Sequence, residues 1–482
     1  MMRGFRSLAA GAVLAGAVLS MAVAQAPAPI PTQDLKQRAF EWVDHNGGRL
    51  IEVSDAVWEF AEVALEEHRS AELLARELEE AGFDVERGVA GLPTAFVARW
   101  GSGEPAIGIL AEYDALPSLS QRRGETEKVA LEPGGAGHGC GHNLYGTACL
   151  GAALALKTVM EEEGLAGTVI LYGCPAEETV IGKVVMARAG LFDGLDAAIT
   201  WHPGTSNRVT VVRSLAMNSF EVTFHGRTAH GAADPWNGRS ALDAVELMNA
   251  GVNMMREHVR PSVRIHYVIT EGGAAPNIVP DLATAWYYVR DTDREGVDEV
   301  YGRVLGAAEA AALATETELE VRFISGVHSE LVNQAIAAAH QRNLELVGGP
   351  DFTEAEQEFA RTIQRNLGIE PSGVSEEIVP LPEHPSGSRG STDVAEVSWI
   401  TPLAEFNVAF VPQGAPWHSW VVVSCSGSSL AHRAMLIAAK TLAATAIDLL
   451  TDPDLLAEAR AEFESATESR PYVSPLDAAR QR

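Results

Sequence analysis

The segment GHGCGH, residues 137–142, places His138, Cys140 and His142 within five positions. The Cys-x-His spacing is too tight for a structural zinc knuckle, whose paired ligands are separated by two or more residues and joined by a second such pair. No second pair follows in the sequence. A thiolate beside imidazoles, with carboxylates supplied elsewhere, suits an open site for one or two divalent ions that activate water.

Three other segments place polar side chains directly after short apolar runs. AEYDALP carries Glu112 and Asp114, CPAEE carries Glu177 and Glu178, and TWHP carries His202. The apolar runs predict strands of an open α/β sheet, and ligands bind such sheets at the carboxyl ends of the strands. Each motif alone is typical of a cap or a surface turn, but together with GHGCGH they predict one shared site.

A competing interpretation of the same residues is a thiol-protease dyad between Cys140 and a histidine. It leaves Glu177, Glu178 and His202 without a role, so we prefer the metal site.

The four cysteines also permit two disulfides in an oxidising compartment. Disulfide frameworks belong mainly to small chains that lack a large core, and Cys149 and Cys174 lie in apolar patterns where a buried free thiol is common. Their disulfide state and that of Cys425 stay open at this stage.

The elements that must position these side chains follow two patterns. In residues 35–207, helical periods alternate with short apolar strands, and residues 326–452 return to helices; together they predict a metal-binding α/β domain with a mixed sheet covered by helices. Residues 208–325 follow the order strand, helix, strand, strand, helix, strand, which predicts a smaller inserted α+β domain. We expect residues 453–482 to form a C-terminal tail.

The ends and the charge of the chain bear on its location and partners. Arg3 and Arg6 precede an apolar run, residues 8–23, and the small residues around position 24 are typical of a signal peptidase site. We expect residues 1–24 to be a cleaved signal peptide and the mature protein to be periplasmic or secreted; a retained anchor is the alternative. A net charge of −29 argues against nucleic acid, and we expect no membrane contact after cleavage.

Several motifs in combination resemble the M20 metallopeptidases, within them the aminoacylase/carboxypeptidase branch that uses a Cys-x-His motif. They are GHGCGHNLYGTA, CPAEE, TWHPG, GRTAHGAADPWNGRSALDAV and PNIVPD, and they occur in the order of the family. The resemblance extends to about residue 450. It implies two divalent ions, manganese or zinc with cobalt or nickel as alternatives, and an inserted domain that forms a homodimer or covers the site.

The resemblance also assigns roles to individual residues. It implies five ion ligands, with the thiolate of the cysteine bridging both ions: Cys140, His142, Glu178, His202 and His418. Glu177 would be the general base. Neighbouring side chains diverge in an extended segment, so adjacent glutamates can serve different roles.

Two supporting residues and two alternatives complete this ligand set. Asp114 and His138 are expected to orient ligands rather than bind ions. The family's first-strand His-x-Asp motif is replaced by Glu112-Tyr113-Asp114, so the ligand list changes if Glu112 binds an ion. His432 is the alternative to His418, although its helical surroundings favour a packed position.

In the inserted domain, the resemblance implies that His230 reaches a carbonyl oxygen across the dimer interface, while Asn277 and Arg290 hold a substrate carboxylate. Each has a structural alternative: a helix cap for His230, a turn for Asn277, and an ion pair with Asp291 or Asp293 for Arg290.

The predicted function is hydrolysis of the amide bond in N-acyl or aroyl amino acids or small dipeptides. The alternatives are a binding module without turnover and an accessory subunit of a hetero-oligomeric hydrolase.

Overall fold

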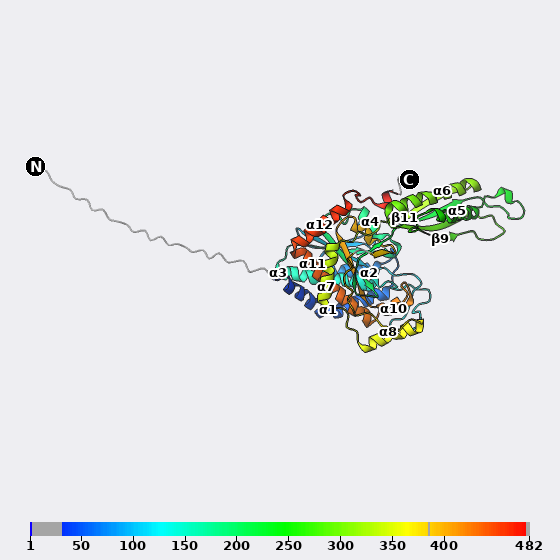
Figure 1. Ribbon diagram of the computed structural model, residues 1–482. Helices are drawn as coiled ribbons and strands as arrows, with labels where there is room; N and C mark the ends of the chain where they lie inside the picture. The colour runs from blue at the N-terminus through cyan, green and yellow to red at the C-terminus, as the bar shows by residue number, and fades with distance from the viewer. Residues whose placement is uncertain (2–30, 384–385, 479–482) are drawn as a thin grey trace.

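The computed structural model describes Met1 and residues 31–383 and 386–478. Apart from Met1, the predicted signal peptide lies outside the described residues. A larger domain contains the N-terminal and C-terminal helices, and an elongated domain made from the middle of the chain projects from it (Figure 1).

The larger domain is built on a seven-stranded mixed sheet in the order β1-β2-β4-β3-β5-β13-β6. Its strands are β1 (Asp84–Arg87), β2 (Phe96–Ser102), β3 (Ala106–Glu112), β4 (Gly167–Cys174), β5 (Ala197–Gly204), β6 (Arg208–Thr210) and β13 (Leu403–Ala409). The four central strands β4, β3, β5 and β13 are parallel, so their carboxyl ends lie at one edge. Their buried apolar runs fit strands that are covered on both faces.

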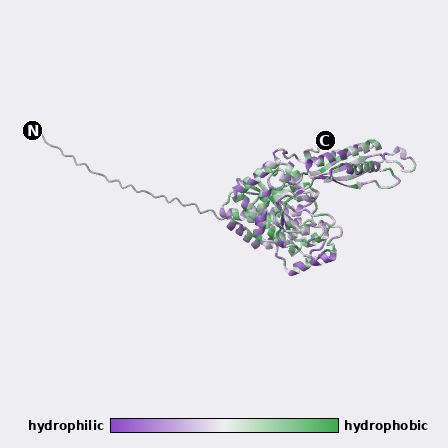
Figure 2. Ribbon diagram, viewed as in Figure 1, coloured by the Kyte–Doolittle hydropathy of each residue, from purple (hydrophilic) through white to green (hydrophobic). Residues whose placement is uncertain are grey.

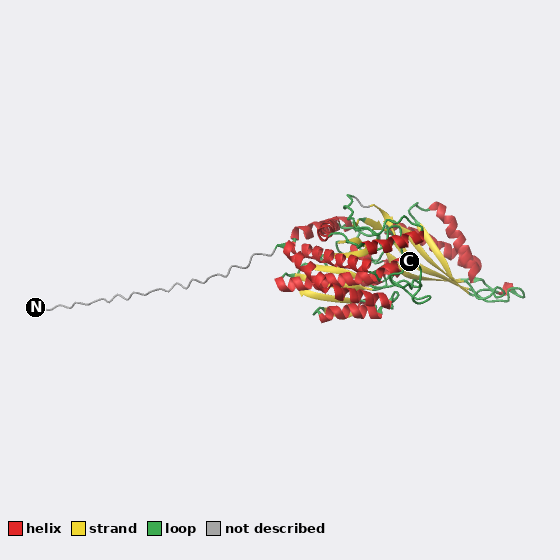
Figure 3. Ribbon diagram, turned by 90° about the horizontal axis from the view of Figure 1, so that it is seen from below, coloured by secondary structure: helices red, strands yellow, loops and turns green. Residues whose placement is uncertain are grey.

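Helices cover both faces of this sheet. The larger core lies under α1 (Thr32–Phe60), α2 (His68–Glu80), α3 (His142–Glu163), α7 (Gln334–Val347) and α11 (Ser429–Thr451). The other face packs against α4 (Gly182–Arg188) and α9 (Val394–Ser398). Helix α10 (Trp420–Ser426) also packs into the main core, and further elements of the domain are η1 (Val89–Gly91), β7 (Val212–Ser214), α8 (Glu354–Leu367) and β12 (Ser386–Arg389). Figure 3 shows the helices layered along the strands.

Helix α11 is long and apolar enough to cross a membrane by length and composition, with a hydropathy of 1.5 over its most apolar window. Two-thirds of that window is buried inside the protein, where α11 packs against α1, α3 and α7. Figure 2 shows the apolar residues concentrated in this interior. The apolar residues of α11 are therefore explained by its packing in the core of the larger domain.

The inserted domain is a four-stranded antiparallel sheet in the order β11-β8-β10-β9, with two helices on one face. Its elements are β8 (Ala216–His225), η3 (Pro235–Asn237), α5 (Ala241–Met255), η4 (Arg256–His258), β9 (Arg264–Glu271), β10 (Leu282–Asp291), α6 (Arg294–Thr315) and β11 (Glu318–Val327). Met217 and Val327, at one end of this sheet, pack against Val180 and Val184 of the larger domain. That end is proximal, and the end where His225 pairs with Leu282 is distal.

The chain passes from the large sheet into the inserted sheet between β6 and β8 and leaves the inserted sheet after β11. Strand β6 pairs with β13 in the large sheet, so the inserted sheet begins at Ala216 rather than at residue 208. The segment expected to be a C-terminal tail instead contains α12 (Pro453–Thr467), which contributes to the main core, and α13 (Pro475–Ala478), which contacts β11 and α4.

Candidate metal centre

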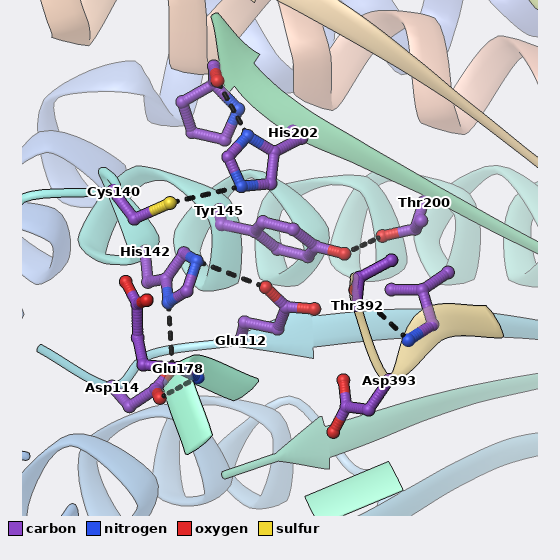
Figure 4. A network of polar contacts seen from close by, with 12 residues as sticks. Glu112, Asp114, Cys140, His142, Tyr145, Glu178, Thr200, His202, Thr392 and Asp393 are labelled. Carbon is purple, nitrogen blue, oxygen red and sulfur yellow. Dashed lines mark hydrogen bonds and ion pairs between the residues drawn. The ribbon is translucent and has the colours of Figure 1, made fainter. Parts of the chain in front are cut away.

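The polar residues predicted at the strand ends gather at the carboxyl edge of the large sheet (Figure 4). Glu112 ends β3, and Glu178 lies in the turn η2 (Glu177–Thr179) after β4. His202 lies near the end of β5, and Cys140 immediately precedes α3. The close-up view shows Cys140, His142 and His202 grouped above Glu112 and Glu178.

A tight turn at Gly141 sets Cys140 beside His142. Gly141 has a φ of +80°, in the left-handed region, and a Cβ there would lie 3.1 Å from both Phe410 and Pro203. Glycine is the residue that adopts this conformation without strain. Helix α3 then starts at His142 and approaches β3 closely, because Gly146 lies against the backbone of Glu112.

Among the described residues, potential ligand atoms form three groups, and the atoms within each group lie within 4.8 Å of one another. The groups are Cys140, His142 and His202; Cys140, Glu178 and His418; and Glu112, His142 and Glu177. The Sγ atom of Cys140 belongs to the first two groups. It lies 3.4 Å from Nε2 of His202, while Nε2 of His418 lies 3.5 Å from a carboxylate oxygen of Glu178. All five predicted ligands therefore meet around one thiol.

Asp114 orients the imidazole of His142. The Nδ1–H group of His142 donates to Oδ1 of Asp114 at 2.8 Å, and the backbone N–H of Glu178 donates to Oδ2 at 2.9 Å. This leaves Nε2 of His142 directed at the other candidate ligands. Carboxylates commonly fix a ligating imidazole in this way.

The two adjacent glutamates point to different groups of atoms. Glu177 lies with Glu112 and His142, whereas Glu178 lies with Cys140 and His418. The prediction of an extended backbone at these two residues is wrong. They lie in a 3₁₀ turn, and the flanking residues Ala176 and Val180 have left-handed backbone conformations.

This turn is tied to the loop before α2. The buried carboxylate of Glu67 accepts the backbone N–H of Ala176 at 2.8 Å and the hydroxyl of Thr94 at 2.9 Å. Burial raises the pKa of Glu67 to about 7, and the charge of Asp114 adds to the rise.

A buried ion-pair network beneath the site was not anticipated from the sequence. Nζ of Lys183 lies 2.6 Å from Oε1 of Glu112 and 2.5 Å from Oδ1 of Asp393, and all three side chains are almost fully buried. The other oxygen of Glu112 lies 3.2 Å from Nε2 of His142. Glu112 is thus a candidate ligand in its own right, the possibility that the Glu-Tyr-Asp motif had raised.

Two of the remaining histidines lie elsewhere. Nε2 of the buried His138 is hydrogen-bonded to the backbone carbonyl of Val57 in α1, at 3.0 Å, so this ring anchors the GHGCGH loop and belongs to none of the three groups. His432 is paired with Asp55 at 3.0 Å. The indole N–H of Trp417, which sequence reasoning missed, points to Cys140 Sγ at 3.2 Å.

The structure contains no disulfide between the four cysteines, all of which lie in its described part. Cys140, Cys149, Cys174 and Cys425 are free and buried. Cys149 donates to the backbone carbonyl of Leu110, consistent with packing in the core.

The electrostatics of the site favour bound cations. Burial raises the pKa of Cys140 to about 12 and that of Glu178 to about 7, and it raises the pKa of Glu177 well above its usual range. Burial opposes the charged form of Asp114, but His142, the backbone N–H of Glu178 and the charge of Lys183 together lower its pKa. A thiolate and several carboxylates in such a site are stabilised when cations compensate their charge.

The donor set fits a pair of divalent ions. Oε1 of Glu178 is buried without a hydrogen-bond partner, although buried polar atoms are normally satisfied, and the contact of His142 Nε2 is the carboxylate oxygen of Glu112 at 3.2 Å. Lys183 is shared between Glu112 and Asp393, so it does not neutralise the carboxylates of the η2 turn. Mixed thiolate, imidazole and carboxylate ligands suit zinc and, with more oxygen donors, manganese.

The inserted domain carries the other predicted residues at two different places. Arg290 lies near the proximal end of β10, opposite Met217 of β8. Its guanidinium lies 5.5 Å from the ring centre of Tyr288, and its Nε has no hydrogen-bond partner. The predicted alternative, an ion pair to Asp291 or Asp293, is absent in this part of the structure, where Arg260 contacts both carboxylates instead.

His230 and Asn277 lie on loops beyond the distal end of the inserted sheet. The two loops are joined by a bridge between His230 and Ile278 and by a hydrogen bond from Gly231 N–H to the carbonyl of Asn277. Nδ1 of the exposed His230 accepts the N–H groups of Ala232 and Ala233. The ring proton is therefore assigned to Nε2.

A thiol shared by two groups of potential ligand atoms, with a carboxylate beside them at the edge of an α/β sheet, is the arrangement expected of a dinuclear hydrolase centre. Residues 216–316 match the peptidase dimerisation domain of M20 proteins. The chain is 40% identical over 454 residues to the B component of p-aminobenzoyl-glutamate hydrolase of Escherichia coli (strain K12), covering 89% of this chain and 94% of the relative. It is 32% identical over 444 residues to Xaa-Arg dipeptidase of Mus musculus, covering 89% and 92%. The chain therefore belongs to the M20 peptidase family and is one of its amidohydrolases or peptidases.

Solved structures share the fold. A dinuclear metal-binding M20 peptidase from Bacillus subtilis has a TM-score of 0.56 at 20% identity, covering 84% of this chain and 99% of its own. An aminobenzoyl-glutamate utilization protein from Klebsiella pneumoniae has a TM-score of 0.59 at 18% identity, covering 85% and 97%. The family and fold inferred from the motifs are confirmed.

Proposed function

We propose that this chain hydrolyses the amide bond of N-acyl or aroyl amino acids or small dipeptides with two divalent ions and Glu177 as general base. The observation that carries the proposal is the position of Cys140, whose Sγ belongs to two ligand groups, while Glu177 lies beside them. The names of the two relatives, an aroyl-glutamate hydrolase and a dipeptidase, support the same class of substrate.

The ligand residues would be Cys140, His142, Glu178, His202 and His418, with Glu112 as a further candidate. Two divalent ions held there would supply Lewis acidity, polarising the amide carbonyl and making water more acidic.

Glu177 supplies the proton transfer. Its buried carboxylate takes a proton from the attacking water and delivers it to the nitrogen of the leaving amine. Asp114 keeps the His142 ring in one tautomer, and Trp417 donates toward the thiolate of Cys140. Arg290 of one copy and Asn277 from the distal loop of a second copy are proposed to hold the carboxylate of the amino acid.

The test is turnover by residues 25–482, purified alone. After loading with Mn²⁺, Zn²⁺, Co²⁺ or Ni²⁺, the protein should release free amino acid from members of a panel of N-acyl amino acids and dipeptides. An accessory role beside another chain is the second candidate, because the name of the bacterial relative describes it as one subunit of a hydrolase. Full metal loading with no turnover of any panel member would favour that candidate and contradict the proposal.

We further propose that His230 acts in the site of a second copy of the chain. Strands β8 and β10 have ten residues each, a length of about 30 Å at about 3.3 Å per residue, and His230 lies beyond their distal end. The ligand groups of the same chain lie in the larger domain, at the proximal side. The match to a dimerisation domain supports a homodimer that brings His230 to a neighbouring centre.

Mixing two inactive variants tests this arrangement. His230→Ala and Glu177→Gln, once their subunits exchange, should regain part of the activity, because one composite site contains an intact His230 and an intact Glu177. A monomer in solution, or exchange without recovery, would show that His230 does not act in trans.

Export remains a proposal supported by the sequence pattern of residues 1–24. Expression of the full chain in a Gram-negative host should yield a periplasmic protein that begins at Gln25, as measured by N-terminal sequencing. An intact N-terminus in the cytoplasmic fraction would contradict export.

A further inference from the structure

A cavity of about 600 Å³ lies beside the candidate metal centre, where the chain crosses between the two domains. His202 and Trp417 contribute to its lining, and both side chains approach Sγ of Cys140. The outgoing crossing supplies Arg208, Thr210, Val212 and Ser214, and the returning crossing supplies Glu330. The cavity therefore shares His202 with the candidate metal centre.

Glu330 is an unsatisfied carboxylate in the wall of this cavity. The residue is 2% exposed, and its Oε1 has no hydrogen-bond partner. Its backbone N–H donates to Oγ of Ser214 at 3.0 Å, which fixes Glu330 against the outgoing crossing. A buried carboxylate without a partner is costly, so this position favours a ligand that brings a hydrogen-bond donor.

A second carboxylate, Glu405, lines the same cavity from β13. Burial raises the pKa of Glu405 to about 7, with the charge of Glu112 adding to the rise and Lys183 and Arg208 opposing it. Burial also raises the pKa of Glu330 well above its usual range, and Glu405 adds to that effect. The charge of Glu405 contributes to the raised pKa of Glu330, so a ligand cation beside them would stabilise both charged forms in addition to Arg208.

The neighbouring amide is already committed to protein contacts. Asn407 lies two residues after Glu405 on the same strand and also lines the cavity. Its Nδ2 donates to the carbonyl of His202 at 2.9 Å, and its Oδ1 accepts the hydroxyl of Thr210 at 2.8 Å. Asn407 holds the wall in place, which leaves Glu330 and Glu405 as the carboxylates of the lining that can accept a ligand donor, while Arg208 in the same lining acts on Glu405.

We infer that this cavity is a specificity subsite for a substrate end that carries a cationic or amine hydrogen-bond donor, accepted first by Glu330 and second by Glu405. The inference rests on the proposed amide hydrolysis. Two sources provide this chemistry: the side chain of the released amino acid, as in arginine or lysine, and an amine on the acyl group, as in 4-aminobenzoyl. A neutral group of the same shape would leave the buried carboxylate unpaired and lose affinity.

Two matched substrate pairs distinguish these sources. N-benzoyl-lysine and N-benzoyl-2-aminoheptanoate differ in an ammonium group against a methyl group, and 4-aminobenzoyl-glutamate and benzoyl-glutamate differ in one amine. In one pair, kcat/KM should be about 10- to 100-fold higher for the substrate with the donor. The pair that shows the preference identifies which part of the substrate enters the cavity.

Variants then assign the preference to Glu330. Glu330→Gln should reduce the preference by about 10-fold or more while leaving turnover of the neutral substrate and metal content unchanged. Glu405→Gln should reduce it less, and Glu377→Gln, at an exposed position outside the cavity lining, should not change it. Retained turnover of the neutral substrate also shows that each variant is folded.

Equal kcat/KM within both pairs, or an unchanged preference in Glu330→Gln, would overturn the inference while the proposed hydrolysis stands. Absence of turnover with all four substrates and with the wider panel would instead contradict the proposed hydrolysis.

Discussion

The candidate metal centre and the distal loops of the inserted domain solve the positioning of functional groups in opposite ways. Around Cys140 and His142 the side chains are buried and held by several contacts before any ligand arrives. His230, by contrast, is exposed and held only by neighbouring backbone groups of its own loop. The difference teaches that all the candidate ligands come from one chain and lie together, whereas the distal residues need a second chain or a domain movement to reach them.

The largest effect is expected at the general base. Glu177→Gln should lower kcat by about 10³- to 10⁴-fold and keep both ions, because the proton carrier is lost while the ligands stay. Glu178→Gln should lose metal as well as activity, because it lies in the ligand group with Cys140. Parallel measurements of kcat and metal content separate the two results; near-normal kcat in metal-loaded Glu177→Gln would sink the assignment.

The shared thiol comes next. Cys140→Ser should lose metal and activity together, by about 10²-fold or more in activity, because a serine hydroxyl is a poorer bridging ligand than a thiolate. Cys149→Ser is the matched control, since Cys149 is a buried thiol that contacts a backbone carbonyl in the core. Full metal occupancy in Cys140→Ser, measured by elemental analysis, would remove Cys140 from the ligand set.

For the distal region we expect a different signature. His230→Ala should lower kcat by about 10²-fold without changing metal content or Tm, because an exposed side chain adds little to folding but can stabilise a developing oxyanion. An unchanged kcat would mean that His230 serves only its own loop, where its Nδ1 caps two N–H groups.

The buried network under the site should show a mainly structural effect. Lys183→Met leaves the carboxylates of Glu112 and Asp393 without their cation, and breaking a buried pair of this kind costs about 3–5 kcal/mol of unfolding free energy. Chemical denaturation of the metal-free protein measures it. Lys128→Met, at an exposed position, is the control and should change stability little. Equal stability of both variants would show that the network does not hold the site.

The smallest effect concerns pH and Glu67. Its pKa is raised to about 7 in the folded protein from an ordinary value of 4.5, so the folded state binds more protons between these values and stability falls as pH rises through this window. Glu67→Gln removes that dependence. The free energy of unfolding of the variant should therefore rise by up to about 3 kcal/mol relative to that of the wild type as the pH increases from 5 to 8. Denaturation at the two pH values measures the gain; a constant difference would contradict the raised pKa.

Much of the larger domain could be predicted because apolar strands and the polar residues that follow them are adjacent in the sequence. Glu112, Glu178 and His202 each follow or end such a strand, and parallel strands bring these ends to one edge. The partners of Glu112 could not be found in this way, because Lys183 and Asp393 lie 210 residues apart and only the fold joins them.

Other features depend on local geometry that residue type does not fix. The 3₁₀ turn at Glu177 depends on left-handed Ala176 and Val180, which are not residues that favour such a conformation. The ring of His138 is directed toward α1, where its partner is the backbone carbonyl of Val57. Every residue has such a carbonyl, so the sequence could not identify this partner.

The central claim is that two divalent ions share the thiolate of Cys140 within one chain. Anomalous diffraction from crystals of the metal-loaded protein tests it most directly. The account predicts two anomalous peaks, both within bonding distance of Cys140 Sγ, about 2.3 Å for zinc, with His142, His202, Glu178 and His418 among the remaining ligands. A single peak, or two peaks that do not share Cys140, would contradict it.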